Sequence, residues 1–393
     1  MRDTFIAKIA NEIPDSGIKD FFDVANKMKD AISLGVGEPD FLVPAYVREK
    51  AIDSIQNGET KYTATEGTIH LREAVARYLS ERFSLHYQAS KEILITVGAS
   101  EAIDLALRTL VNPGEEVLIV EPSYVSYLPC VMLCGGIPVV VPTYVKNHFK
   151  VTPQDLREAI TAKTRVLILP FPNNPTGAIM EKEDLLAIRE MVLAYDLFVI
   201  SDEIYAELTY GTKHVSIASL PDMRERTLVL NGFSKAFAMT GWRLGFAAGP
   251  EEVISTMHKI HQYNIMSANT TSQIAGLEAL THPNRDQEIE TMRRAYNERR
   301  QVLVNGFRQM GLDCYEPRGA FYVFPSIQKT GLSSMEFCER LLAEEKVAVI
   351  PGTAFGACGE GFIRCSYAYA LEDIKECLKR ISQFVIRLQS VNI

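Results

Sequence analysis

The segment from Asn231 to Gly245, NGFSKAFAMTGWRLG, places a hydroxyl, an amine and a guanidinium at short spacing after a buried-looking run. A lysine amine acts as a nucleophile only after it has lost its proton, and desolvation and positive neighbours favour that loss. Lys235 stands between two phenylalanines, which suits this requirement. Ser234 and Arg243 could hold a phosphate dianion, because arginine offers a planar fork of donors. Alternatively, the Ser-Lys pair belongs to an ordinary surface loop.

Three further segments place polar groups where strands are expected to end. Val97–Ala102, VGASEA, ends an apolar run and opens a helical pattern, where free N–H groups and the helix dipole favour an anion. Pro170–Gly177, PFPNNPTG, is a Pro/Asn turn, and Asp202 follows the apolar run Leu197–Ile200. Each segment has a plain structural alternative: a helix start, a simple turn and a helix N-cap, respectively.

Taken together and in order, these segments resemble the cofactor motifs of fold-type I enzymes that use pyridoxal 5′-phosphate (PLP). The lysine segment matches S-K-x-x-x-x-x-G-x-R, and the turn matches N-P-T-G. The resemblance is to the class I/II aspartate and aromatic aminotransferases, especially the bacterial subgroup that includes N-acetyl-L,L-diaminopimelate aminotransferase. It extends from about Leu34 to Tyr367 and implies that Lys235 carries PLP as a Schiff base.

The resemblance assigns the phosphate of PLP to several segments. Ala99 and Ser100 lie on the string that cups the phosphate, and Ser234 and Arg243 reach it from the lysine segment. Tyr62, in KYTATEG, matches a Y-x-x-x-x-G element that reaches the PLP phosphate of the neighbouring subunit. The resemblance therefore implies a homodimer with active sites at the interface.

The PLP ring has its own implied contacts. Asp202 pairs with the pyridine N1–H, so that the protonated ring can withdraw electrons. Asn174 and Tyr205 bond the phenolic oxygen O3′, and Tyr124, in EPSY, stacks on the pyridine face. Without the resemblance, an aromatic residue in such a loop is more often a packing residue. Lys235, Asp202 and Tyr205 are the implied catalytic residues.

Substrate contacts are expected at three further places. Arg364 lies in an apolar, strand-like run, where an unpaired charge is costly and needs an anion. A structural salt bridge would satisfy it, whereas the family uses this arginine, with Asn174, to clamp the substrate α-carboxylate. Gly37, in SLGVGEPD, matches a glycine that lets the backbone approach that carboxylate. Ile18, in SGIKDFF, resembles part of a mobile arm over the substrate; the alternative is a helix packed on the core.

The pattern of apolar runs predicts the elements that position these residues. From about Glu92, β-branched runs alternate with helical patterns, which predicts a mainly parallel sheet with helices on both faces. Ligands of such sheets bind beyond the carboxyl ends of the strands. The predicted strands are Ile93–Val97, Glu116–Val120, Ile137–Val141, Arg165–Leu169, Phe198–Ser201, Thr227–Asn231 and Gly245–Ala248.

A smaller α+β unit is predicted after Pro283. Gln287–Met310 predicts a long connecting helix, and Leu371–Leu388 predicts a final amphipathic helix. The predicted strands of this unit are Ala320–Phe324, Val347–Ile350 and Phe362–Tyr367. With the resemblance, the expected fold is the α/β PLP-dependent transferase fold (fold type I), with a mixed, mainly parallel seven-stranded sheet. Its expected parts are an arm with part of the small domain (1–45), the large PLP-binding domain (46–285), and the connecting helix with the small domain (286–393).

Composition argues against other classes of protein. The net charge of -8, from 41 basic and 49 acidic residues without a basic stripe, argues against a nucleic-acid partner. No apolar run reaches about 18 residues and the N-terminus lacks a signal-peptide core, so no membrane partner is expected. The seven cysteines show no CxxC spacing, which favours reduced thiols in a cytoplasmic protein, and no metal site is predicted.

The predicted activity is transfer of an amino group from an L-amino acid to a 2-oxo acid such as 2-oxoglutarate, by a ping-pong mechanism. The donor is expected to be of the aspartate, aromatic or N-acetyl-L,L-diaminopimelate type. Strict aspartate specificity is doubtful, because Tyr263–Ser272 contains no arginine and Ser100 stands where some aspartate enzymes have a lysine. The enzymatic alternative is a PLP-dependent C–S β-lyase. A regulator with a DNA-binding unit before the enzyme-like domain is disfavoured, because the resemblance starts by Leu34.

Overall fold

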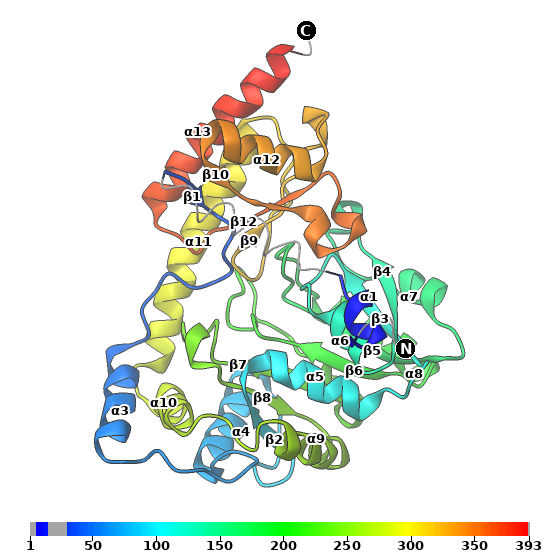
Figure 1. Cartoon of the computed structure of the whole chain (residues 1–393), viewed down its shortest axis with the longest axis vertical. Coiled ribbons are helices and arrows are strands. Elements are labelled where there is room, and N and C mark those ends of the chain that lie inside the picture. Colours follow the sequence, from blue (N-terminus) through cyan, green and yellow to red (C-terminus); the bar gives the residue numbers. More distant parts are fainter. Residues whose placement is uncertain (1–4, 15–29, 392–393) are drawn as a thin grey trace.

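The computed structural model describes residues 5–14 and 30–391, which form a larger lower unit and a smaller upper unit in Figure 1. The long helix α11 (Arg285–Gln309) runs from one unit into the other. Ile18, expected on the substrate arm, lies outside the described residues. Within the described ranges, no helix is long and apolar enough to cross a membrane.

The large sheet has the strand order β2-β8-β7-β6-β5-β3-β4. Only β8 runs antiparallel to its neighbours, and all other adjacent strands in the sheet are parallel. Each strand differs from its predicted range by at most one residue at either end, and the predicted seven-stranded, mainly parallel sheet is confirmed. The strands are β2 (Ile93–Thr96), β3 (Glu116–Glu121), β4 (Ile137–Pro142), β5 (Thr164–Leu169), β6 (Phe198–Asp202), β7 (Thr227–Gly232) and β8 (Gly245–Ala248).

Helices cover both faces of this sheet, because successive side chains of a buried strand point to opposite faces. Leu94 and Ile200 pack with α5 and α9 on one face, and Leu167 and Val199 pack with α8 on the other. The helices of this part are α3 (Ala45–Gln56), α4 (Ile69–Phe83), α5 (Gly98–Leu110), α6 (Tyr127–Leu133), α7 (Pro153–Ala159), α8 (Lys182–Ala194), α9 (Glu251–Asn264) and α10 (Thr270–Thr281). The short helix α1 (Lys8–Glu12) contacts α6.

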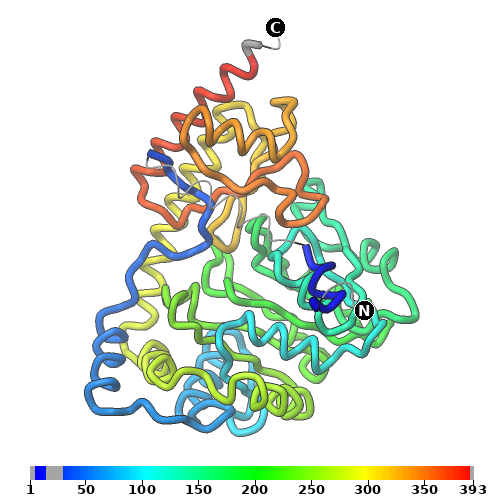
Figure 2. The backbone as a smooth tube through the Cα atoms, viewed as in Figure 1, coloured from blue at the N-terminus to red at the C-terminus, as the bar shows by residue number. Residues whose placement is uncertain are grey.

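The smaller unit contains two small sheets and the helices α12 (Ser334–Glu345) and α13 (Leu371–Val391). β1 (Ile32–Ser33) pairs in parallel with β10 (Val347–Ala348). The second sheet is antiparallel, with the order β11 (Ile350–Pro351), β12 (Ile363–Ser366) and β9 (Tyr322–Val323). The predicted strand Val347–Ile350 is therefore two short strands in different sheets. Figure 2 shows the early segment through β1 crossing this unit before it descends to α3.

A single hydrophobic cluster joins the two units. It includes Val199 of the large sheet, Tyr296 of α11, Phe321 beside β9 and Phe384 of α13, all of them buried. Burial of such large side chains contributes about 1.5–3 kcal/mol each, so the interface between the units is part of the core. The loops at the carboxyl ends of the strands are thereby held against the smaller unit.

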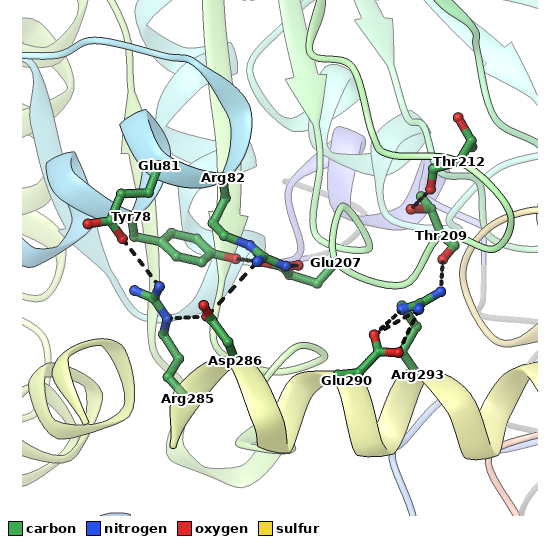
Figure 3. Close-up of polar contacts among 10 residues, drawn as sticks. All are labelled: Tyr78, Glu81, Arg82, Glu207, Thr209, Thr212, Arg285, Asp286, Glu290 and Arg293. Carbon is green, nitrogen blue, oxygen red and sulfur yellow. Dashed lines mark hydrogen bonds and ion pairs between the residues drawn. The ribbon is translucent and has the colours of Figure 1, made fainter. Parts of the chain in front are cut away.

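The lower end of α11 is fixed by ion pairs, which Figure 3 shows. The carboxylate of Glu207, 5% exposed, accepts a hydrogen bond from the Tyr78 hydroxyl at 2.9 Å and pairs with Arg82 at 2.6 Å. Arg82 also lies 4.0 Å from Asp286 in the first turn of α11. The start of the connecting helix is thus tied to α4 and to the turn that follows β6.

Candidate active site

A cavity of about 520 Å³ opens where the carboxyl ends of β2, β3, β5, β6 and β7 meet the smaller unit. Tyr62 is not among its lining residues: its side chain is 82% exposed, in the loop before α4. Thirteen residues were predicted to form the site, and eleven of them line this cavity: Gly37, Ala99, Ser100, Tyr124, Asn174, Asp202, Tyr205, Ser234, Lys235, Arg243 and Arg364.

Lys235 lies in the loop after β7 and lines the cavity. Nζ donates a hydrogen bond to the Gly37 carbonyl at 2.6 Å and lies 5.8 Å and 5.6 Å from the ring centres of Tyr205 and Phe321. Burial lowers the pKa of Lys235 to about 8, a trend that two nearby arginines reinforce and the Glu38 carboxylate opposes. An amine with this pKa has a useful neutral fraction near physiological pH.

Asp202, the last residue of β6, is buried under the cavity. Its Oδ2 accepts a hydrogen bond from the Tyr127 hydroxyl at 2.7 Å, and its Oδ1 accepts one from the Ile204 N–H at 3.2 Å. Burial raises the pKa of Asp202, and the Tyr127 bond opposes that rise. The alternative of a helix N-cap is wrong, because β6 is followed by turns. Tyr124 lines the cavity edge-on to Tyr127, at 5.7 Å between ring centres.

Sequence reasoning missed Tyr127 and Tyr322, which both line the cavity. Tyr322, on β9, shares a hydrogen bond between hydroxyls with Tyr205 at 2.8 Å. A Cβ built on Gly37 would lie 2.2 Å from the Tyr322 hydroxyl, so the absence of a side chain at Gly37 makes room for this tyrosine. Tyr127 could have been found, because it lies three positions after Tyr124; nothing local in the sequence points to Tyr322.

The loop between β2 and α5 forms a small cup beside Arg243. Gly98 has φ +75, and a Cβ there would lie 2.7 Å from Arg243 Nη2. Gly245 is equally restricted, since its Cβ would lie 2.6 Å from the Ala99 N. The first turn of α5 also leaves N–H groups without acceptors inside the helix. This cup therefore offers free N–H groups and a guanidinium, and its two glycines leave no room for a side chain. Such a set of donors fits a phosphate group. Ser234 lines the same cavity.

Arg364, on β12, is 3% exposed and stacks between two rings, 4.5 Å from the centre of Tyr322 and 4.7 Å from that of Phe355. Its Nη1 donates to Asn174 Oδ1 at 2.9 Å, and its Nη2 donates to the Gly35 carbonyl. Its Nε has no hydrogen-bond partner within the described part of the chain. No carboxylate of the described residues pairs with Arg364, so the structural salt bridge considered from the sequence is absent there.

The sheet order, the lysine of lowered pKa, the buried carboxylate and the phosphate-sized cup together define a PLP-dependent transferase of fold type I. No group of three or more His, Cys, Asp or Glu side chains that could hold a metal occurs in the described residues. The residues present fit PLP: the cup fits its phosphate, Asp202 its ring nitrogen and Lys235 its aldehyde.

The chain belongs to the class I and II aminotransferases, because the model of that family matches residues 29–381. These are PLP-dependent enzymes, so the cofactor of the chain is pyridoxal 5′-phosphate. The chain is 50% identical to the putative aminotransferase YugH of Bacillus subtilis, over 97% of this chain and 98% of that protein. It is 46% identical to an aspartate aminotransferase of Pyrococcus abyssi, over 94% of this chain and 95% of that one.

Two further similarities name other substrates. The chain is 41% identical to a probable N-acetyl-LL-diaminopimelate aminotransferase of Bacillus subtilis, over 98% of this chain and 97% of that protein. It also superposes on the crystal structure of an aromatic aminotransferase from Pyrococcus horikoshii with a TM-score of 0.90, at 43% identity, over 94% of this chain and 99% of that one. Aspartate, aromatic and diaminopimelate-type enzymes therefore all occur among similar proteins.

Proposed function

We propose that this aminotransferase moves the amino group of an L-amino acid to 2-oxoglutarate or a similar 2-oxo acid by a ping-pong mechanism, in the cytoplasm. The observation that carries this proposal is the state of Arg364. Among the described residues, this guanidinium is buried, stacks between two rings, has only neutral acceptors and retains one N–H without a partner. Such a group is satisfied by an anion of the size of a carboxylate.

Arg364 and Asn174 are proposed to bind the α-carboxylate that all 2-amino and 2-oxo acids share. The Arg364–Asn174 hydrogen bond of 2.9 Å holds both groups on the same wall of the cavity. The Lys235 amine lies on that cavity too. Binding of the carboxylate would therefore fix the Cα–H of the substrate within reach of Lys235 Nζ.

Bound PLP supplies an electron-withdrawing ring that acidifies the Cα–H of the amino acid. Lys235 Nζ is proposed to take that proton and to return it later in the cycle, since its lowered pKa suits it to both tasks. The Asp202 carboxylate holds the proton on the ring nitrogen. Tyr205 and Asn174 are proposed to donate hydrogen bonds to O3′, with Tyr124 against the ring face.

The amino donor is proposed to be of the aspartate, aromatic or N-acetyl-L,L-diaminopimelate type. Similar proteins carry all three names. The cavity residues argue against a site built only for dicarboxylates, because Ser100 supplies no charge and Arg364 is proposed for the α-carboxylate. The loop 263–272, which also lacks arginine, gives no second cation.

A homodimer is part of the proposal, because two exposed tyrosines require an explanation. The side chains of Tyr62 and Tyr263 are 82% and 92% exposed, respectively. Met266, which lies close to Tyr263 in the sequence, is 45% exposed. Exposed aromatic side chains of this size are typical of interfaces. Tyr62 is proposed to reach the PLP phosphate of the partner subunit.

The test is a half-reaction screen on the PLP-loaded enzyme. Single amino acids are added without an acceptor, and the absorbance of the bound cofactor and the 2-oxo acid formed are both followed. We expect one class of donor to convert the cofactor stoichiometrically to its amino form, and 2-oxoglutarate to reverse the change. Release of pyruvate and thiol from cystathionine, repeatedly and without an acceptor, would instead establish the C–S β-lyase.

Arg364→Lys is the matched variant, because it keeps the charge and removes the planar fork. We expect the donor concentration for half-maximal conversion to rise about tenfold or more, since hydrogen bonds between charged groups are worth about 1.5–3 kcal/mol. If the donor concentration for half-maximal conversion does not change, Arg364 does not bind the α-carboxylate.

A further inference from the structure

A buried histidine and a glutamate lie behind the proposed phosphate cup. His261, on α9, has no exposed side-chain surface, and its Nδ1 lies 2.8 Å from Glu101 Oε1. Glu101 belongs to the first turns of α5 and is 12% exposed. Because an ionised carboxylate can only accept, the Nδ1–H of His261 donates this hydrogen bond.

The other carboxylate oxygen of Glu101 holds the turn that opens α5. Oε2 accepts the backbone N–H of Val97 at 2.6 Å. Val97 is the N-cap of α5 and has no side chain that could cap the helix. Glu101 therefore fixes the residue immediately before Gly98, where the chain turns into the cup.

The placement of Glu101 brings a second anion near the phosphate. A carboxylate and a phosphate dianion at one helix N-terminus are attracted by the same free N–H groups and the same end of the helix dipole. Two negative charges at the same helix N-terminus also repel each other. The cup should therefore bind the phosphate most tightly when the Glu101 carboxylate is held away from the N–H groups of residues 98–100.

His261 is arranged to hold it there. Its Nε2 is buried and has no hydrogen-bond partner within the described residues, so Glu101 is the one hydrogen-bond partner of the ring there. We propose that His261 is a positioning residue for PLP: it keeps the Glu101 carboxylate on the Val97 N–H and so leaves the cup to the cofactor phosphate. This inference rests on the proposed place of the phosphate.

The proposed role of the His261–Glu101 contact predicts how the dissociation constant of PLP changes in three variants. His261→Leu frees a carboxylate beside the cup, and we expect the dissociation constant of PLP to rise about tenfold, the value of a hydrogen bond to a charged group. His261→Asn can keep a donor near the Nδ1 position and should stay within about twofold of the parent protein. The double variant Glu101→Gln/His261→Leu removes the competing charge and should bind PLP more tightly than His261→Leu alone.

The phosphorus-31 NMR resonance of PLP in the loaded enzyme gives a readout independent of activity. We expect it to move in His261→Leu and to return toward the parent position in the double variant. His214→Leu is the matched control, because it breaks another buried histidine–carboxylate contact of 2.8 Å, with Glu203, the residue after Asp202 in the sequence. The control should leave the phosphorus resonance in place.

Three results would overturn the inference: an unchanged dissociation constant and resonance in His261→Leu, a double variant weaker than the single one, or an equal shift in His214→Leu. If His261→Leu does not fold, His261→Met replaces it with the same expectation, because methionine also has no donor for Glu101. Arg243→Gln separates this inference from the proposed function. If Arg243→Gln weakens PLP binding and His261→Leu does not, only the role of His261 fails; if Arg243→Gln has no effect, the place of the phosphate fails as well.

Discussion

The Tyr127 hydroxyl donates a hydrogen bond to Asp202 Oδ2 over 2.7 Å, and both side chains are buried. The two residues come from different strand ends: Tyr127 begins α6 after β3, and Asp202 ends β6. Desolvation raises the pKa of Asp202, which would weaken its charge, and the tyrosine hydroxyl counteracts this. Tyr127 therefore supports the ionised form of the carboxylate that is proposed to face the PLP ring nitrogen.

Tyr127→Phe should shift the acid limb of the pH–rate profile to higher pH. Without the hydroxyl, the pKa of Asp202 rises further, so the carboxylate loses its charge at a higher pH than in the parent enzyme. We expect a fall in kcat of about tenfold near neutral pH, partly recovered at higher pH, because one hydrogen bond to a charged group is lost. A pH–rate profile with an unmoved acid limb would contradict this role.

The lowered pKa of Lys235 predicts how the cofactor-free protein captures PLP. Below pH 8 most of the amine is protonated, and the neutral fraction rises about tenfold per pH unit until it levels near pH 8. Stopped-flow absorbance from pH 6 to 10 should show this plateau. Nα-acetyl-lysine, with an ordinary pKa of about 10.4, is the control and should keep gaining rate through pH 10. A protein rate that climbs in parallel with the control would show that Lys235 is not desolvated.

The large sheet and most of the cavity could be predicted because their signals are local. Strands such as Thr227–Gly232 are continuous apolar runs with a polar loop behind them, and parallel order brings those loops to one edge. Asn174, Asp202 and Lys235 lie on three such loops, so their meeting follows from topology alone.

The smaller unit was harder to predict, because its contacts join distant positions. β1 has two residues, too few to show alternation, and its partner β10 lies more than three hundred positions away. Tyr322 meets Tyr205 across 117 positions, and only tertiary packing brings them together. The run Val347–Ile350 looks like one strand, yet it is divided between two sheets, since β10 pairs with β1 and β11 with β12.

Gly98→Ala tests the proposed phosphate cup. The new Cβ would meet Arg243 Nη2 at 2.7 Å and would also force a positive φ on alanine. Gly114→Ala is the matched control, because Gly114 has φ +84 and no atom of the described residues lies within 4 Å of the added Cβ. Both variants should lose about 1 kcal/mol of folding free energy from the backbone alone. Only Gly98→Ala should also weaken PLP binding, measured by equilibrium titration; equal affinities in the two variants would place the phosphate elsewhere.

Glu207→Gln tests whether the base of α11 is held by the network in Figure 3. Glu207 is 5% exposed and is held by both Arg82 and Tyr78, so the loss of its charge leaves the Arg82 guanidinium without its main partner. Because the Arg82 side chain is 33% exposed, water screens part of this pair, and the loss of a hydrogen bond between charged groups here costs about 1.5–3 kcal/mol. We expect the free energy of unfolding in urea to fall by that order.

Glu290→Gln is the control on the same helix. Glu290 also holds two arginines, Arg293 at 2.7 Å and Arg294 at 2.5 Å, but it is 35% exposed and both partners lie within one turn of α11. Pairs of that type contribute less than about 1 kcal/mol, because water screens them and the helix already holds the partners close. Glu207 holds Arg82 of α4, which in turn contacts Asp286 of α11, whereas Glu290 pairs only within α11. The two variants should therefore differ several-fold in their effect on the free energy of unfolding. Equal losses would mean that the network adds nothing beyond surface charge, and that the hydrophobic cluster alone fixes the connecting helix.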